Sequence, residues 1–175
     1  MRILTLSGSL RAQSTNAALL KAAAALAPEG LYCVAFDGLA SLPAFDPDLE
    51  KSGDLPLAVQ AWSRALKSSA GLIISSPEYA HGMPGALKNA LDWVVGSGEL
   101  VDKPVLLFNA ASAGGDKAQA ALVQTLTVMS AKVLVEASLL GPLLHRPVDE
   151  EGRITRPELA EAIRASLRAL ALAAA

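Results

Sequence analysis

The densest group of potential anion donors in the sequence is the segment SGSLRAQSTN at residues 7–16. Gly8 allows the backbone to turn sharply or to approach a ligand closely. Arg11 adds a guanidinium, whose planar fork of donors matches phosphate oxygens, and no acidic residue precedes Glu29. The side-chain donors of the segment are Ser9, Ser14, Thr15 and Asn16. A helix that begins here would add backbone N–H groups and a positive dipole end, so the segment is typical of a site for a phosphate monoester.

The residues alone leave a second interpretation of this segment open. An ordinary turn between a strand and a helix, capped by Ser14, would use the same residue types. The lysine and the spacing of a P-loop are missing, and Gly8 has no partner glycines for a G-x-G-x-x-G fingerprint. Asp37 lies where a dinucleotide-binding fold would place its ribose-binding acid, but without those glycines we interpret it as a turn residue.

A second group of reactive side chains lies in SPEYAHGMPGALKNALDW, residues 76–93. A carboxylate, a phenol and an imidazole occur together at Glu78, Tyr79 and His81. They lie in a turn that starts at Pro77 and that gives way to a helix at Pro84, a residue favoured in the first helical turn. A plain connector does not require these three side chains, so their meaning depends on what lies beside the turn.

Five short apolar segments predict the strands that would position these loops, because none of them alternates cleanly between apolar and polar residues. They are ILTLS (3–7), YCVAF (32–36), GLIIS (71–75), VLLFNA (105–110) and KVLVEA (132–137). Helical patterns follow them at 15–26, 56–68, 84–95, 117–131 and 156–175. The alternation predicts an α/β fold with helices on both faces of a five-stranded parallel sheet, in the order 2-1-3-4-5. This order makes the loops after strands 1 and 3 neighbours at the edge where ligands bind.

Composition restricts the class of protein. The 175 residues are 52% apolar and 18% charged, which predicts one folded domain over residues 1–175. A net charge of −2 does not favour nucleic acid or an acidic membrane surface as partner. Cys33 is the single cysteine, so no internal disulfide forms, as is usual in a reducing cytoplasm. No apolar run reaches the roughly 20 residues of a membrane helix, and we expect a cytoplasmic protein.

The two loop segments together resemble the NADPH-dependent FMN reductase family, a flavodoxin-like group of NAD(P)H-dependent quinone, chromate and azo reductases. Members carry Gly-Ser-x-Arg-x-x-Ser-x-Asn after the first strand, here Gly8, Ser9, Arg11, Ser14 and Asn16. After the third strand they carry a second motif, matched here by Pro77, Glu78, Tyr79, Pro84, Gly85, Leu87, Lys88, Asn89, Ala90, Asp92 and Trp93. One departure is Ala80, which stands where the family usually has Asn.

The resemblance implies a flavodoxin-like, FMN-binding domain and assigns roles to the loops. The first loop would hold the FMN phosphate, and the loop of Pro77, Glu78, Tyr79 and Ala80 would lie along the flavin ring. The third loop, in NAASAGGDKAQ at 109–119, would add Ser112, Gly114 and Gly115. Backbone N–H groups of the two glycines would stabilise the negative charge of a reduced flavin. An ordinary turn between a strand and a helix is the alternative for this third loop.

The resemblance also implies the activity. NADPH or NADH would pass a hydride to FMN, and the electrons would go on to a small acceptor such as a quinone, an azo compound, chromate or free flavin. His81 is a candidate on the substrate side, either as a proton donor or as a solvated loop residue. Two histidines and one cysteine without ligand spacing predict no metal site. A flavodoxin-type electron carrier or a redox-sensing FMN-binding module are the alternatives, the carrier disfavoured by the small net charge.

The helix after Pro84 carries an expectation about assembly. Its residues Leu87, Leu91 and Val94 form the stripe predicted to pack on the sheet, and Lys88 and Asp92 have the spacing of an i,i+4 ion pair. Trp93 lies off this stripe, so we expect it at a subunit interface. A homodimer or homotetramer with its sites near the interface is the assembly that the family resemblance implies.

Overall fold

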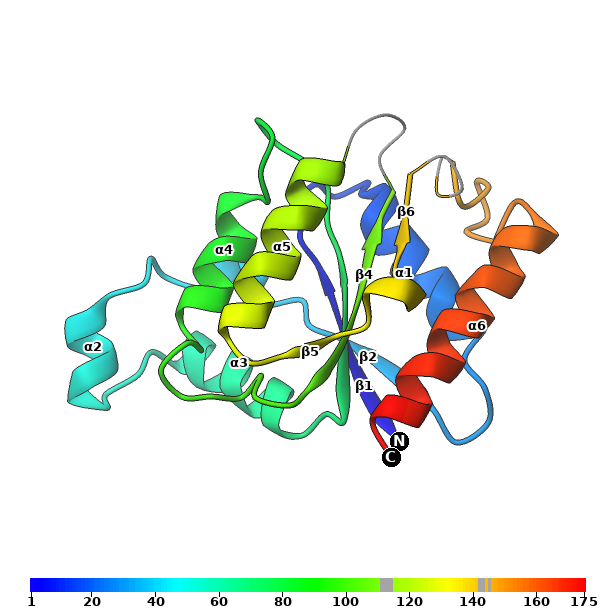
Figure 1. Cartoon of the computed structure of the whole chain (residues 1–175). Helices are drawn as coiled ribbons and strands as arrows, with labels where there is room; N and C mark the ends of the chain where they lie inside the picture. Colours follow the sequence, from blue (N-terminus) through cyan, green and yellow to red (C-terminus); the bar gives the residue numbers. More distant parts are fainter. Residues whose placement is uncertain (111–114, 142–143, 145) are drawn as a thin grey trace.

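The computed structural model describes residues 1–110, 115–141, 144 and 146–175, and a parallel sheet forms its centre (Figure 1). The strands are β1 (Arg2–Ser7), β2 (Tyr32–Ala35), β3 (Gly71–Ser75), β4 (Pro104–Asn109), β5 (Lys132–Val133) and β6 (Leu139–Leu140). They follow the order β2-β1-β3-β4-β5, and β6 also pairs with β4. All these pairs are parallel. The predicted α/β class and flavodoxin-like strand order are therefore confirmed.

Helices cover both faces of the sheet, as the apolar strands require (Figure 1). The long ones are α1 (Thr15–Ala25), α3 (Leu57–Lys67), α4 (Gly85–Asp92), α5 (Asp116–Val128) and α6 (Pro157–Ala173). Leu4 and Leu6 of β1 belong to the core that contains α3, α4 and α5. Ile3, which directly precedes Leu4 on the strand, belongs to the core that contains α1 and α6. The pleat thus sends neighbouring residues of one strand into two separate cores.

The fifth strand differs from the prediction, because it is split. Only Lys132–Val133 forms β5, a 3₁₀ turn (Val135–Ala137) follows, and the chain returns to β4 as β6. Because of this interruption, the backbone N–H of Leu107 in β4 has no carbonyl of the fifth strand as its acceptor. The hydroxyl of Ser138 accepts from that N–H at 3.0 Å and donates to the Leu134 carbonyl at 2.9 Å. A serine side chain therefore replaces the missing ladder bond.

The segment after β2 holds an additional helix that the sequence patterns did not predict. A 3₁₀ turn (Leu39–Ser41) comes first, and α2 (Pro47–Ser52) follows. The carboxylate of Asp46 caps α2 by accepting from the backbone N–H of Asp48 at 2.9 Å. This segment therefore contains a short capped helix with proline at its first position.

The predicted position of Trp93 at a subunit interface is wrong. Its side chain is 2% exposed and lies under the segment before α2 of the same chain. The indole Nε1 donates to the Pro43 carbonyl at 2.8 Å, and the ring meets Phe45 edge-on at 5.1 Å between centroids. The amide of Asn89 clasps the same segment, donating to the Pro43 carbonyl and accepting from the Phe45 N–H, both at 2.8 Å. An intrachain loop covers the surface that the helix pattern left without a partner.

Other expectations for α4 are confirmed. Leu87, Leu91 and Val94 are at most 1% exposed, and Lys88 pairs with Asp92 at 2.5 Å. The single cysteine, Cys33 of β2, is partly buried, and that burial raises the pKa of its thiol to about 11. None of the helices in the described ranges has the length and apolar content of a membrane-spanning segment.

Candidate functional site

The loops after β1 and β3 meet in one cavity at the carboxyl ends of the strands. This cavity, called the phosphate cavity below, measures about 200 Å³. Its lining residues are Ser9, Arg11, Gln13, Ser14, Thr15, Asn16, Pro77, Tyr79 and Ala110. Seven of the nine were singled out from the sequence, and the strand order is what brings the two groups together. Gln13 and Ala110 are additional, and no carboxylate lines the cavity.

Serine hydroxyls fold the first loop onto itself. The Ser7 hydroxyl accepts from the Ser9 N–H at 3.3 Å, and the Ser9 hydroxyl accepts from the Arg11 N–H at 3.3 Å. These short side-chain-to-backbone bonds stabilise a tight turn without other secondary structure. Because Ser9 uses only its acceptor capacity here, its hydroxyl proton is available to a ligand in the cavity.

The start of α1 presents further donors to the same cavity. Ser14 is the N-cap, and its hydroxyl accepts from the Ala17 N–H at 3.3 Å. The preceding amides of the first turn, those of Thr15 and Asn16, have no acceptor within the helix. The Ser14 hydroxyl proton, these two N–H groups and the helix dipole all favour an anion. The predicted Ser14 cap is confirmed, and it leaves free the donors that the predicted anion cradle would use.

Asn16 joins the first loop to the ends of β3 and β4. It is 6% exposed, and its Oδ1 accepts from the Ser75 hydroxyl at 2.8 Å and from the Ala110 N–H at 3.3 Å. The side-chain oxygen, which the sequence offered only as part of a ligand-binding amide, is thus committed to the fold. Its backbone N–H remains directed into the first turn of α1 as a donor.

Gly8 is required by a close approach of the chain to itself. A Cβ at this position would lie 2.6 Å from the Ser76 hydroxyl and 3.0 Å from a methyl of Leu87. The Gly8 N–H donates to the Ser75 carbonyl at 2.8 Å, which extends the pairing of β1 with β3. Glycine therefore lets the first loop leave the sheet directly beside the loop that follows β3.

The loop after β3 is a tight hairpin turn. Tyr79 and Gly82 exchange both backbone hydrogen bonds, at 2.9 and 3.0 Å. Ala80 and His81 between them have φ of 50° and 61°, the left-handed pair of a type I′ turn, in which Asn-Gly is the preferred sequence. The turn places the Tyr79 ring, 55% exposed, at the edge of the phosphate cavity. Ala80 occupies the strained first position where Asn would be favoured.

Glu78 ties this hairpin to the third loop, a role that the sequence did not reveal. Its Oε2 accepts from the Ala118 N–H in the first turn of α5 at 3.0 Å. That backbone hydrogen bond lowers the pKa of the Glu78 carboxyl, and the neighbouring His81 ring lowers it further. The other oxygen, Oε1, lies 3.3 Å from His81 Nδ1. The carboxylate therefore caps a helix 40 positions away and fixes the two loops relative to each other.

His81 lies at the outer end of the hairpin. Its side chain is 85% exposed, and the contact with Glu78 is its described polar interaction. An exposed imidazole beside a carboxylate can exchange protons with a bound substrate. Both interpretations drawn from the sequence, proton donor and solvated loop residue, are compatible with this position.

The third loop is partly described. Ser112 and Gly114, predicted to bind the cofactor, lie outside the described residues. Gly115 has φ of 95° and caps α5, and a Cβ there would meet the Asn109 amide at 2.9 Å. The buried Asn109 donates to the Gly115 carbonyl at 3.3 Å, so it closes the base of this loop. An Asn ending an otherwise apolar strand was the signal in the sequence for this residue.

The chain is similar in sequence to a known protein family. The family model described as NADPH-dependent FMN reductase matches residues 1–142. The quinone reductase of Escherichia coli (strain K12) is 30% identical over 155 residues, 86% of this chain and 82% of the relative. The NAD(P)H-dependent FMN reductase of Pseudomonas aeruginosa is 31% identical over 176 residues, 98% of this chain and 94% of the relative.

Solved structures share the fold. The flavoenzyme NAD(P)H:(acceptor) oxidoreductase FerB from Paracoccus denitrificans has a TM-score of 0.83 at 24% identity, over 97% of this chain and 94% of its own. The apo form of the NADH:FMN oxidoreductase EMOB has a TM-score of 0.69 at 20% identity, over 98% of this chain and 88% of its own. At these identities the likeness supports the flavodoxin-like fold.

Proposed function

The chain belongs to the NADPH-dependent FMN reductase family, and from that premise we propose that it is an NAD(P)H-dependent quinone reductase that binds FMN at the loops following β1, β3 and β4. Its family fixes the cofactor and the enzyme class. The acceptor is our proposal, and it rests on relatives named quinone reductase in bacteria and NADPH:quinone oxidoreductase in rice.

The residues present fit FMN at its phosphate. The phosphate cavity is lined by hydroxyls, helix-terminal amides and a guanidinium, and no carboxylate opposes an anion there. The hydroxyl oxygens of Ser9 and Ser14 each accept a backbone hydrogen bond, and their hydroxyl protons remain available to a ligand. We assign the phosphate to Ser9, Arg11, Ser14, Thr15 and Asn16. This cavity, in which two loops 60 residues apart supply one donor set free of acids, is the observation that carries the proposal.

The remaining loops suit the flavin ring. We assign Pro77, Glu78, Tyr79 and Ala80 to one edge of the ring, with Gly115, Ser112 and Gly114 at another. FMN, when bound at these residues, would supply the chemistry of hydride acceptance and two-electron transfer. The chain contributes rigidity, because Glu78 joins the hairpin to α5, and it contributes the positive dipole end of α5.

The acceptor would occupy the open side of the hairpin. Tyr79 offers an exposed aromatic face for a planar quinone, and His81 stands two residues further with its imidazole in solvent. We propose that His81 donates a proton to the quinone oxygen as charge develops there. A His81→Asn variant keeps a residue that tolerates positive φ and removes the proton donor, so kcat with benzoquinone should fall while FMN affinity stays the same.

Reconstitution and turnover test the function directly. Purified protein mixed with FMN should show the flavin absorption bands, and release on denaturation should return FMN rather than FAD. NADPH or NADH oxidation should then proceed with benzoquinone at a higher kcat/KM than with an azo dye, chromate or free FMN. Bound FMN with no quinone turnover would refute the acceptor, while a protein that binds no FMN would refute the site.

A further inference from the structure

A second cavity lies beside the phosphate cavity, on the outer side of α1. This lateral cavity measures about 550 Å³. It is lined by Ala12, Gln13, Ser14, Thr15, Ala17, Ala18, Lys21, Arg146, Pro147 and Val148. Gln13, Ser14 and Thr15 line both cavities. A ligand that reaches past the first turn of α1 could therefore touch the cofactor side and the lateral cavity at once.

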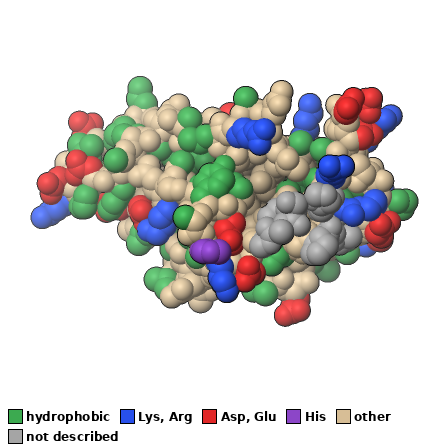
Figure 2. Space-filling view, turned by 90° about the horizontal axis from the view of Figure 1, so that it is seen from above, with side chains coloured by type: hydrophobic (Ala, Val, Ile, Leu, Met, Phe, Trp, Pro, Cys, Tyr) green, Lys and Arg blue, Asp and Glu red, His purple; other side chains and the backbone are tan. Residues whose placement is uncertain are grey.

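Two cations face the lateral cavity and no carboxylate lines it. Lys21 comes from α1, and Arg146 comes from the segment that precedes α6. Neither side chain pairs with another residue within the described part of the chain. Asp37 lines a separate cavity that also touches Lys21, without an ion pair within 4.0 Å. Figure 2 shows several Lys and Arg side chains on the right half of the face that carries the loops.

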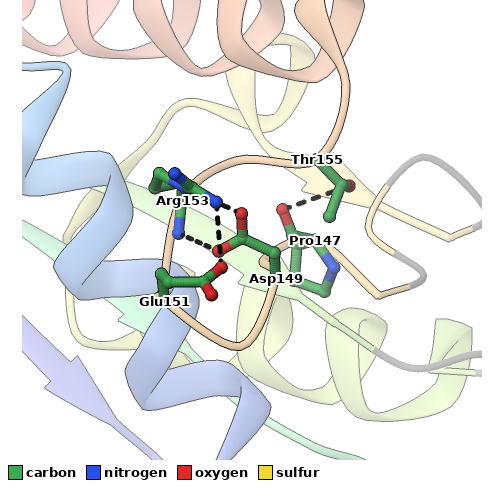
Figure 3. Close-up of polar contacts among 5 residues, drawn as sticks. All are labelled: Pro147, Asp149, Glu151, Arg153 and Thr155. Carbon is green, nitrogen blue, oxygen red and sulfur yellow. Dashed lines mark hydrogen bonds and ion pairs between the residues drawn. The ribbon is translucent and has the colours of Figure 1, made fainter.

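Two of the three acids that follow Arg146, Asp149 and Glu151, pair with Arg153. Asp149 binds Arg153 Nε at 2.8 Å and accepts from the Arg153 backbone N–H at 2.8 Å (Figure 3). Glu151 binds Arg153 Nη2 at 2.9 Å. The Asp149 and Glu151 carboxylates therefore pair with Arg153 rather than with Arg146, and none of the three acids lines the lateral cavity. The acidic turn at Asp149 and Glu151 is thus distinct from the basic lateral cavity, although Arg146 is only a few residues away in sequence.

The backbone holds Arg146 in place. Val148 and Ile154 form an antiparallel bridge, and the Thr155 N–H donates to the Pro147 carbonyl at 3.1 Å. The Thr155 hydroxyl donates to the Arg146 carbonyl at 3.0 Å. Arg146 itself has φ of 44°, a left-handed conformation that persists where surrounding contacts impose it. The hairpin therefore fixes the start of the Arg146 side chain beside α1.

We propose that the lateral cavity binds the 2′-phosphate of NADPH through Lys21 and Arg146, and that the enzyme prefers NADPH to NADH for this reason. The inference rests on the proposed function, because it assumes a nicotinamide dinucleotide beside the cofactor. The phosphate cavity already accounts for the phosphate of FMN, so the lateral cations are available to a different anion. The 2′-phosphate is the group that NADPH has and NADH lacks. Two cations in a cavity lining without carboxylates favour binding of such a dianion.

Kinetics of charge-removing variants test the proposal. Lys21→Gln and Arg146→Gln should each lower the ratio of kcat/KM for NADPH to that for NADH about fivefold, the effect of one exposed charge contact of about 1 kcal/mol. Lys51→Gln and Arg64→Gln remove exposed cations elsewhere and should leave the ratio unchanged. FMN affinity, measured by flavin fluorescence, should stay the same. Equal losses for both dinucleotides, a lower FMN affinity, or a wild type that favours NADH would overturn the proposal.

A binding measurement separates this site from the proposed function. Calorimetric titration of the FMN-loaded protein with 2′,5′-ADP should show binding that weakens in Lys21→Gln and Arg146→Gln and with rising salt. The matched probe 5′-AMP lacks the 2′-phosphate and should bind more weakly by a similar factor. Binding of 2′,5′-ADP in a protein without quinone turnover would uphold the site and refute the acceptor. Equal binding of both probes, or of inorganic phosphate as tightly as 2′,5′-ADP, would overturn the site.

Discussion

Single side chains at this site serve the fold and the ligand with different atoms. Ser9 and Ser14 accept backbone hydrogen bonds and keep their protons, so each one shapes the loop and still donates. Asn16 uses its side-chain oxygen to join three loops and its backbone N–H to face the cavity. Mutations that change one of these atoms can therefore separate stability from ligand affinity.

Asn16 allows such a separation. Asn16→Asp keeps an oxygen for the Ser75 hydroxyl and the Ala110 N–H, but its negative charge repels a phosphate. We expect at least a tenfold loss of FMN affinity, about 1.4 kcal/mol, with riboflavin affinity unchanged. Asn16→Ala should instead lower the free energy of unfolding by about 1–3 kcal/mol, because two buried donors lose their acceptor. Flavin fluorescence titration and urea unfolding measure the two effects, and wild-type FMN binding by Asn16→Asp would contradict the phosphate assignment.

Short elements set the positions of the loops, and they do so with backbone conformations that particular residues favour. The type I′ turn at Ala80 and His81 is one case, and the Gly115 cap of α5 is another. The helix α4 is a third, since its Asn89 and Trp93 hold the segment before α2 rather than a ligand or a second subunit. One motif thus combines a loop at the site with a helix that serves as scaffold.

The strained turn gives a stability prediction. Ala80→Asn should relieve part of the left-handed strain and raise the free energy of unfolding by about 1 kcal/mol, because Asn tolerates positive φ. For a chain of this length the melting temperature should rise by about 2–4 °C. Ala80→Val, β-branched at the same position, should lower it. A thermal melt followed by circular dichroism measures both, and no gain for Ala80→Asn would show that the turn carries no such strain.

Trp93 gives a prediction about assembly. Trp93→Phe keeps an aromatic ring against Phe45 but removes the hydrogen bond to the Pro43 carbonyl, which should cost about 1 kcal/mol of unfolding free energy. The molar mass in solution should equal that of the wild type, since the side chain is buried within its own subunit. The homo-oligomer implied by the family stays a prediction. Light scattering coupled to gel filtration tests both points, and a drop in mass for Trp93→Phe would restore the interface.

Charge is distributed differently at the two ends of the sheet. The carboxyl ends of the strands carry the phosphate and lateral cavities, whose linings contain cations and no carboxylate. In the loop that leads into β4 lies Glu99, whose side chain is fully buried. Burial would raise the pKa of its carboxyl, but hydrogen bonds from Ser63 and Ser97, together with Lys67 at 3.4 Å, lower it below 4.5. The ionised form is therefore the one that the fold stabilises.

Acid unfolding should report this buried carboxylate. Because its pKa is lower in the folded chain than in the unfolded chain, Glu99 stabilises the fold above about pH 4.5, and the contribution is lost as pH falls through the folded pKa. Glu99→Gln should lose about 1 kcal/mol at pH 7 and show a shallower loss of stability below pH 4.5 than the wild type. Glu158→Gln, on the first turn of α6, is the control. Urea unfolding at several pH values measures the slopes, and parallel acid limbs for Glu99→Gln and wild type would contradict this account.

The sequence by itself determined the layout of the protein. Apolar strands and the periodicity of the helices are local patterns, and they predicted the sheet order. In α6 the helically spaced Leu159, Ile163, Leu167 and Leu170 are all buried. Residue types in two loops were enough to indicate an anion cradle and a family resemblance. The same local signals placed those loops side by side, because parallel strands end at one edge of the sheet.

Tertiary structure alone decided which partners these residues have. The Asn16 bond to Ala110 joins positions 94 apart, and the Glu78 bond to Ala118 joins positions 40 apart. A pattern within one helix could not show that the segment at Pro43 covers Trp93, or that a 3₁₀ turn interrupts the fifth strand. Lys21 and Arg146 likewise share a cavity only because α1 and the hairpin before α6 pack on the same side. Local sequence sets propensity and chemistry, whereas contacts between distant segments depend on the packing of the whole chain.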